Sequence, residues 1–446
     1  MFNLKVIGNI VLADKIIKGG SLLIQDGKIA TIEAKSDAKA KQILNFEGCL
    51  ILPGVVDEHV HSRSEPTKDI DDATKAAASG GVTTIIDMPY DAGAPVTSAK
   101  IFNEKVSLIK EKAIVDVALL ATLPKWGGSE YIDELIKVGA CGFKLSIYET
   151  DPNRFPRIPD SELIKIFSAL SKTDLRVGFH AEIDEIVKAL TNDYRRKDPL
   201  NPLSHCKSRP PVAETAAVLH LLELAISTKV KLHFYHLSLP RSLYLADCYR
   251  KEGLDVTTET CPHYLILNQE DMLRLKGRGK INPPLRTQKD QEGLWQSIKK
   301  GKIDTVASDH VAWPKSKKDN DNIFENSAGC PGVDLILPLI FHYGVSKGRI
   351  DIHTLIRLLS FSPSRLFGLS KTKGEIAVGK DADLAIIDPE SSFKVKGAKS
   401  FSGAGWSPYE GMELKGKIVS TIVRGEIVFD GEKIVKKEGF GQFIKR

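Results

Sequence analysis

Close cysteine pairs are absent from this 446-residue sequence. Its six cysteines are scattered along the chain, and no two of them form a C-x-x-C pair. This pattern argues against a disulfide framework and against a cysteine zinc cluster, and it fits a reducing compartment. We therefore expect a cytoplasmic protein with free thiols.

Long apolar runs and basic clusters are absent as well. No run is long enough to span a bilayer, and Met1–Lys5 does not resemble the start of a signal peptide. The formal net charge of +6 is small for this length, and no Lys/Arg cluster with interleaved aromatic residues occurs. We expect neither a membrane nor a nucleic-acid partner. Contents of 42% hydrophobic and 27% charged residues are typical of a globular protein.

Both ends of the chain have the pattern of β-hairpins. Near the N-terminus two short apolar runs flank Asp26-Gly27, and near the C-terminus two others flank Arg424-Gly425. Isolated hairpins are only marginally stable in water. We therefore predict that residues 1–52 and residues 372–446, the latter including a tail, together build one small β-sandwich domain.

Strand-like and helix-like segments alternate over residues 53–371. Such alternation predicts parallel strands joined by crossover helices, of which Asp69–Ser79 and Glu214–Thr228 are two. Eight β/α units suit an α/β fold of the (β/α)8 TIM-barrel type, and a doubly wound sheet is the alternative. The eight strand candidates end near His61, Asp87, Leu120, Lys144, His180, His236, Thr260 and Asp309.

The first of these strands carries two histidines one residue apart. Val55–His61 has the pattern of a short buried strand that follows Pro53-Gly54. Residues i and i+2 of a strand point to the same face, so His59 and His61 can present two imidazoles to one metal ion. A zinc-type site needs at least three protein ligands, so this pair is incomplete by itself.

Other predicted strands end on further candidate metal ligands. Active sites of TIM barrels lie at the C-terminal ends of the strands, where these side chains would gather. Each has an ordinary structural explanation when taken alone; Asp309, for example, could cap a helix. Taken together, they predict a binuclear metal site formed by His59, His61, Lys144, His180, His236 and Asp309.

The residue types in this set suit one particular chemistry. Four imidazoles and one carboxylate can hold two divalent ions, zinc being our first expectation and manganese or cobalt the alternatives. A lysine that is desolvated near cations has its neutral amine favoured, and such an amine can add carbon dioxide. We expect N6-carboxylated Lys144 to bridge the two metal ions. Asp309 would act as the catalytic acid–base, moving a proton from the activated water to the leaving nitrogen.

The sequence resembles the cyclic amidohydrolases of the amidohydrolase superfamily over essentially its whole length. This group comprises hydantoinase and dihydropyrimidinase, allantoinase, and dihydroorotase. The resemblance implies a TIM barrel, a β-sandwich built from both termini and two metal ions bridged by a carboxylated lysine, with the six residues above at the ligand positions. It rests on Pro53–His61, Gly80–Thr84, Asp87-Met88-Pro89, Gly142-Phe143-Lys144, His180-Ala181-Glu182, Ser208-Arg209-Pro210, Glu259–Tyr264, Pro283–Arg286 and Ser308-Asp309-His310.

The motifs that distinguish the members of this group favour different members. Dihydroorotases share His61-Ser62-Arg63, whose arginine would bind a substrate carboxylate, and also share Asn282 before two prolines. Here, however, Ser64 interrupts their usual Glu-Pro-Gly run, and Tyr90 replaces their asparagine. The alternative role for Arg63 is an ion pair with Glu65, Asp69 or Asp71.

Allantoinases and hydantoinases share other segments. Allantoinases share Leu294-Trp295 and Gly441-Gln442-Phe443, and hydantoinases share Pro331-Gly332-Val333 and Ser407–Met412. The substrate-contacting tyrosine of hydantoinases follows the lysine by five residues, whereas Tyr148 follows Lys144 by four. The candidate substrate contacts are therefore Arg63, Tyr90, Tyr148 and Asn282.

We predict a metal-dependent hydrolase that opens a hydantoin-like or dihydropyrimidine-like ring to an N-carbamoyl product. Allantoinase is the first alternative and dihydroorotase the second. A catalytically silent scaffold protein is the alternative from another class, although such relatives typically lack several ligands. The expected partner is a small cyclic amide, and the resemblance implies a homo-oligomer, either tetramer or dimer.

Overall fold

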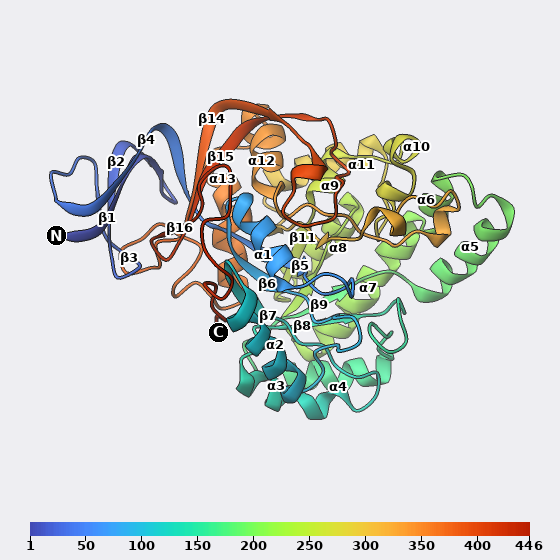
Figure 1. Cartoon of the computed structure of the whole chain (residues 1–446). Coiled ribbons are helices and arrows are strands. Elements are labelled where there is room, and N and C mark those ends of the chain that lie inside the picture. Colours follow the sequence, from blue (N-terminus) through green and yellow to red (C-terminus); the bar gives the residue numbers. More distant parts are fainter.

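The computed structural model describes residues 1–446 and contains a parallel barrel beside a separate sheet (Figure 1). Both ends of the chain contribute to the separate sheet, as the sequence predicts. In spatial order its seven strands are β16 (Glu426–Phe429), β15 (Glu413–Val423), β14 (Leu384–Lys394), β4 (Ala40–Pro53), β1 (Phe2–Val11), β2 (Ile16–Gln25) and β3 (Lys28–Glu33).

The two predicted hairpins form at opposite edges of this sheet. Asp26 and Gly27 join β2 to β3, and Arg424 and Gly425 join β15 to β16, all four with φ between 47° and 76°. Such two-residue turns match the twist of antiparallel strands. Twelve buried apolar residues from both halves, among them Leu22 from β2 and Ile386 from β14, form one core. The halves therefore fold as a single unit although they are distant in sequence.

The barrel strands follow the order of the chain. β12 (Thr305–Val306) pairs with β11 (Val256–Thr260), and β13 (His310–Val311) pairs with β5 (Val55–His61). A bridge between Ala121 and Phe143 joins the third strand to the fourth. These contacts close the ring, which establishes a TIM barrel and excludes the doubly wound sheet. The eight strands are β5 (Val55–His61), β6 (Val82–Asp87), β7 (Asp116–Leu119), β8 (Phe143–Ser146), β9 (Val177–His180), β10 (Leu232–Phe234), β11 (Val256–Thr260) and β12 (Thr305–Val306).

Helices surround the barrel strands (Figure 1). None of them is both long and apolar enough to cross a membrane. They are α1 (Ile70–Ser79), α2 (Ala99–Lys112), α3 (Ile132–Val138), α4 (Asp160–Leu170), α5 (Asp184–Lys197), α6 (Leu203–Ser208), α7 (Pro211–Thr228), α8 (Pro240–Lys251), α9 (Pro262–Ile266), α10 (Asp271–Leu275), α11 (Gln288–Lys299), α12 (Ile336–Ile340), α13 (Ile352–Ile356) and α14 (Ser362–Leu366).

The two helices predicted by range form with small shifts in their starts. Asp69 caps α1 by accepting the backbone N–H of Ile70. The predicted second helix begins three residues earlier than expected, at Pro211 of α7, because proline fits the first turn of a helix. Glu214 is then buried inside α7, where its carboxylate accepts the hydroxyl of Ser242 at 2.6 Å.

The connection between the sheet and the barrel is very short at the end of β4. Only Gly54 separates β4 from β5, and a Cβ at this position would collide with the Thr83 side chain. We propose that the sheet unit comprises residues 1–52 and 372–446 and that the barrel comprises residues 53–371. The last residues return to the barrel, since Ile444 donates its backbone N–H to Val117 of β7 at 2.8 Å.

Candidate metal centre and active site

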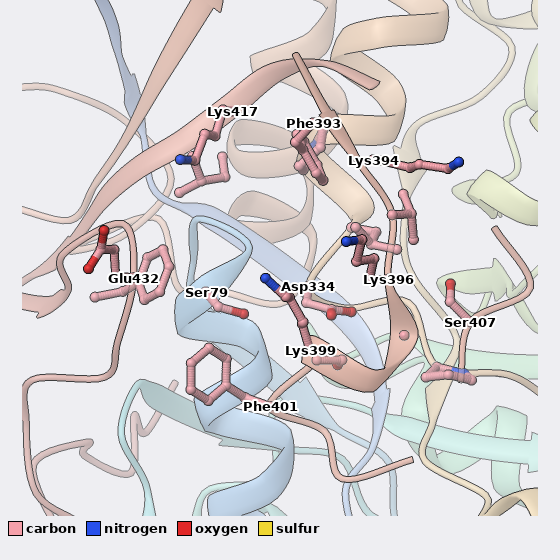
Figure 2. A pocket seen from close by; sticks show the side chains of 18 of the residues that line it. Ser79, Asp334, Phe393, Lys394, Lys396, Lys399, Phe401, Ser407, Lys417 and Glu432 are labelled. Atoms are coloured by element: carbon pink, nitrogen blue, oxygen red, sulfur yellow. The ribbon is translucent and has the colours of Figure 1, made fainter. Parts of the chain in front are cut away.

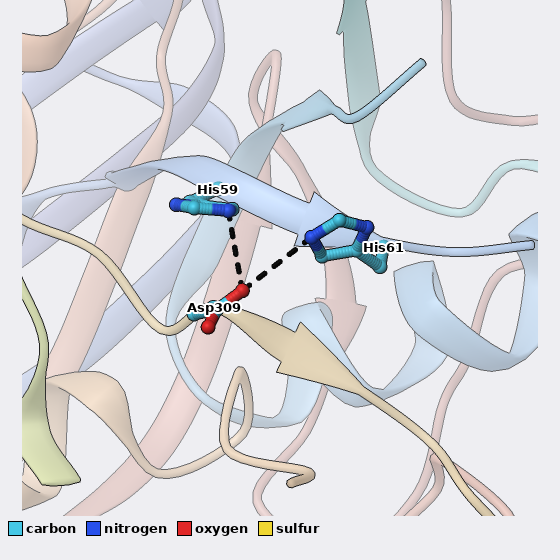
Figure 3. A group of neighbouring side chains, drawn as sticks. All are labelled: His59, His61 and Asp309. Carbon is cyan, nitrogen blue, oxygen red and sulfur yellow. Dashed lines mark ion pairs between the residues drawn. The ribbon is translucent and has the colours of Figure 1, made fainter. Parts of the chain in front are cut away.

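Two histidines and an aspartate converge at the C-terminal end of β5. Asp309, which lies between β12 and β13, places Oδ1 3.1 Å from His59 Nε2 and 3.4 Å from His61 Nε2. Figure 3 shows both imidazole rings beside this carboxylate. Since the two histidines alternate on one strand face, the spacing seen in the sequence produces the expected pair.

The other three predicted ligands lie at the same end of the barrel. Lys144 places Nζ 3.4 Å from His59 Nε2, and His180 Nδ1 lies 3.1 Å from His236 Nε2. All six predicted ligands line one cavity of about 110 Å3. The structure therefore brings together the complete set that the sequence predicts.

Two members of the set follow their strands through a left-handed backbone conformation. His236 has φ 41° and lies two residues beyond β10, and Asp309 has φ 48° and lies three residues beyond β12. Non-glycine residues seldom adopt this conformation, and those that do are enriched at functional sites. The regular strands thus end two and three residues earlier than the sequence predicts.

Burial favours the neutral forms of three of these histidines and of Lys144. Desolvation lowers the pKa of His59 and of His236 well below the usual value, and it also lowers the pKa of His180. Desolvation lowers the pKa of Lys144 to about 8. Neutral imidazoles and a neutral amine are the forms that bind metals and add carbon dioxide, respectively.

Two buried carboxylates contact ring nitrogens of two of these histidines. Glu259 Oε1 lies 2.8 Å from His59 Nδ1, and Glu182 Oε2 lies 2.8 Å from His180 Nε2. Arg209 pairs with Glu182, and its charge contributes to lowering the pKa of that carboxyl to about 2. The sequence prediction did not assign a role to either glutamate, although both belong to motifs that carry the resemblance.

The predicted substrate contacts divide into two pairs. Tyr90 and Asn282 line the cavity, whereas Arg63 and Tyr148 do not. Arg63 Nε lies 3.5 Å from Asp69 Oδ1, which is one of the alternative ion pairs considered from the sequence. Tyr148 lies beneath the guanidinium of Arg209.

Arg154 and Phe155 line the cavity although nothing in their sequence pattern pointed to this role. They belong to the connection between β8 and α4. Phe155 stacks on Tyr90 with ring centroids 3.7 Å apart. Arg154 donates from Nη1 to the backbone oxygen of Ser64 at 2.9 Å.

A larger hollow of about 670 Å3 lies elsewhere, between the sheet and the barrel. Figure 2 shows Lys396, Lys399 and Lys417 around it, with Asp334 near its centre. No histidine or cysteine lines this hollow. Its only carboxylates are Asp334 and Glu432, and a zinc-type site needs at least three protein ligands, so the smaller cavity is the candidate active site.

The sequence matches the Amidohydrolase family over residues 50–428. The chain belongs to this family. Similar proteins span the full length of this amidohydrolase. The L-hydantoinase of Paenarthrobacter aurescens is 32% identical over 438 residues, covering 96% of this chain and 95% of the relative. The allantoinase of Rubrobacter xylanophilus is 32% identical over 451 residues and covers 97% of each chain.

A solved structure of L-hydantoinase (dihydropyrimidinase) from Arthrobacter aurescens superposes on this amidohydrolase with a TM-score of 0.96. The two are 32% identical, and the superposition covers 100% of each chain. This agreement extends to the barrel and to the sheet built from both termini.

Amidohydrolases depend on metal ions, and the donor atoms of this amidohydrolase suit them. His59, His61 and Asp309 each offer a ligand atom within 4.8 Å of the others. His236 Nδ1 is buried and has no hydrogen-bond partner, which is costly unless another group binds it. Imidazole and carboxylate ligands suit divalent ions of the zinc class.

Proposed function

We propose that this amidohydrolase opens a hydantoin-like or dihydropyrimidine-like ring to an N-carbamoyl product. The observation that carries this proposal is the convergence of all six predicted ligands on one cavity at the C-terminal end of the barrel. The full-length similarity to an L-hydantoinase supports the choice of ring. The equally similar allantoinase makes allantoin the second candidate substrate, and dihydroorotate is the third.

We assign two divalent ions, with zinc as the first choice, to four histidines, Asp309 and N6-carboxylated Lys144. When bound, such ions lower the pKa of water and polarise a carbonyl group. The neutral amine needed for carboxylation is favoured because desolvation lowers the pKa of Lys144 to about 8. Tyr90 supports this residue by donating its hydroxyl to the backbone oxygen of Lys144 at 2.8 Å.

Asp309 is the proposed catalytic acid–base. Its carboxylate lines the cavity beside two candidate metal ligands, where it can accept the proton of the attacking water. The water oxygen adds to the ring carbonyl carbon, and the bond from that carbon to the ring nitrogen then breaks. Asp309 returns the proton to this nitrogen, and the opened product carries a carbamoyl group and a carboxylic acid that releases the second proton of the water to the solvent.

A panel of four rings tests the proposal. Metal-loaded protein is assayed with hydantoin, dihydrouracil, allantoin and dihydroorotate, with Asp309→Asn as the inactive control. We expect ring opening of hydantoin or dihydrouracil. Selective turnover of allantoin or dihydroorotate would move the assignment to that ring, and failure to open any ring by protein that contains stoichiometric metal would favour the silent scaffold.

We also propose a cytoplasmic homo-oligomer, either a tetramer or a dimer. All six cysteines are free, and the three most buried ones are Cys141, Cys261 and Cys330. Free buried thiols are typical of proteins from reducing compartments. Light scattering coupled to size-exclusion chromatography measures the oligomeric state, and a monomer at micromolar concentration would contradict this part of the proposal.

A further inference from the structure

We propose that Arg154 binds a carboxylate on the substituent of the substrate ring. The preferred substrates would then be cyclic amides that carry an acidic side arm. This inference rests on the proposed ring-opening function and narrows its substrate class. Its starting point is that Arg154 lines the same cavity as the six candidate metal ligands.

Nε and Nη2 of the Arg154 guanidinium form no hydrogen bond within the protein. Nη1 donates to the backbone oxygen of Ser64 at 2.9 Å, which fixes the side chain between the segment that follows β5 and the segment that follows β8. Nε is buried and has no hydrogen-bond partner. A buried donor without a partner costs free energy, so this nitrogen is suited to receive a ligand acceptor.

The edge formed by Nε and Nη2 has the geometry that binds a carboxylate through two parallel hydrogen bonds. Arg278 shows this arrangement elsewhere in the chain, where its Nε and Nη2 hold the two carboxylate oxygens of Asp319 at 2.9 Å and 3.0 Å. In Arg154 the corresponding pair is Nε and Nη2, because Nη1 is already occupied by Ser64. A ligand carboxylate bound at this edge would leave the hydrogen bond from Nη1 to Ser64 in place.

The charges around the cavity favour an anion. Asp309 is the only carboxylate among its sixteen lining residues. The Asp151 carboxylate accepts the backbone N–H of Arg154 at 2.8 Å, but no carboxylate forms an ion pair with the Arg154 guanidinium. Arg63 differs in this respect, because Asp69 and Asp91 face its guanidinium. Arg154 is thus the arginine that remains available to a substrate.

The aromatic residues beside Arg154 would position the ring. Phe155 stacks on Tyr90, and both line the cavity. A flat ring that lies against these side chains would extend its substituent toward the adjacent guanidinium. A carboxylate on a short arm satisfies both contacts, whereas an apolar substituent would leave the buried Nε without a partner.

The test compares two isosteric substrates, hydantoin-5-acetic acid and hydantoin-5-acetamide. They differ in charge and hardly in size. We measure kcat/KM for both with metal-loaded wild type, Arg154→Gln and Arg154→Lys. Arg157→Gln is the matched control, because it removes the same charge from the same connection at a residue that does not line the cavity.

We expect wild type to prefer the acid at least tenfold, since a bidentate charge-assisted pair is among the stronger polar contacts. Arg154→Gln should lower kcat/KM for the acid by about 10–100-fold and for the amide by less than about threefold. Arg154→Lys should retain part of the preference, because it keeps the charge but loses the planar fork. Arg157→Gln should leave the ratio unchanged.

Two outcomes would overturn the inference. If Arg154→Gln lowers kcat/KM equally for the acid and the amide, Arg154 only holds two segments together. If Arg154→Gln has the kcat/KM of wild type for both substrates, Arg154 does not take part in substrate recognition. Calorimetry with hydantoin-5-acetic acid separates this inference from the proposed function. If no ring is opened but the acid binds wild type more tightly than Arg154→Gln, the ring-opening function fails and the carboxylate site stands; equal binding would refute both.

Discussion

Glu259 Oε1 lies 2.8 Å from His59 Nδ1 and accepts the backbone N–H of His236 at 2.9 Å. One carboxylate oxygen thus fixes the ring of one candidate metal ligand and the backbone of another. With Nδ1 engaged by Glu259, His59 presents Nε2 to Asp309 and to the cavity. Carboxylates behind metal-binding histidines commonly select the tautomer and the ring orientation in this way.

Replacing Glu259 should therefore weaken metal binding. We expect Glu259→Ala to lower metal affinity by about 10–100-fold, the range typical of such outer-shell partners. Glu259→Gln keeps an acceptor for His59 and should have a smaller effect. Competition with a chromophoric chelator measures the affinity, and an affinity for Glu259→Ala equal to that of wild type would contradict the positioning role.

The metal content of the protein can be counted directly. We expect close to two divalent ions per chain in active protein, and we expect His61→Ala to lose at least one, because His61 Nε2 faces Asp309 across the proposed site. His220→Ala is the control, since that histidine pairs with Asp160 on the surface. Elemental analysis that finds no stoichiometric metal in active protein would refute the binuclear assignment.

Lys144→Ala should abolish activity, and added acetate or formate should restore part of it by replacing the bridging carbamate. Reactivation of metal-free wild type at a fixed concentration of dissolved carbon dioxide should accelerate as the pH rises through about 8. The sign follows from the pKa of Lys144, which burial lowers to about 8, so that the reactive neutral amine dominates above that pH. Lys165→Ala, on the surface of α4, is the control.

A Lys144→Ala variant with the metal content and rate of wild type would exclude the carbamate. Reactivation that slows with rising pH would show instead that the neutral amine of Lys144 does not control the rate of reactivation.

Asp309→Asn should keep the fold and most of the metal but lose activity. General acid–base catalysis contributes about 10²–10⁴-fold, and we expect kcat to fall by at least this amount. Circular dichroism and elemental analysis establish that the fold and the metal are retained. A rate within about tenfold of wild type, equivalent to about 1.4 kcal/mol in activation free energy, would remove Asp309 from the proton-transfer step.

The six candidate ligands could be predicted because strand geometry is regular. Alternation places His59 and His61 on one face, and parallel strands bring their C-terminal ends to one side of a barrel. The same regularity predicted the hairpins β2–β3 and β15–β16 at the two edges of the sheet. The predicted strand ends at His236 and Asp309 were less accurate, because both residues have a left-handed backbone conformation, which the apolar pattern of a strand does not reveal.

The amino-acid sequence by itself determined the family and the six candidate metal ligands that line the cavity, and it narrowed the architecture to a TIM barrel or a doubly wound sheet. These conclusions follow from local patterns along the chain. Only the tertiary structure decided which arginine the cavity contains. Arg63 is turned toward Asp69 and Asp91, while Arg154 is held by the backbone oxygen of Ser64, ninety positions away. The direction of a long side chain in a connecting segment depends on such distant partners, and spacing along the chain does not specify them.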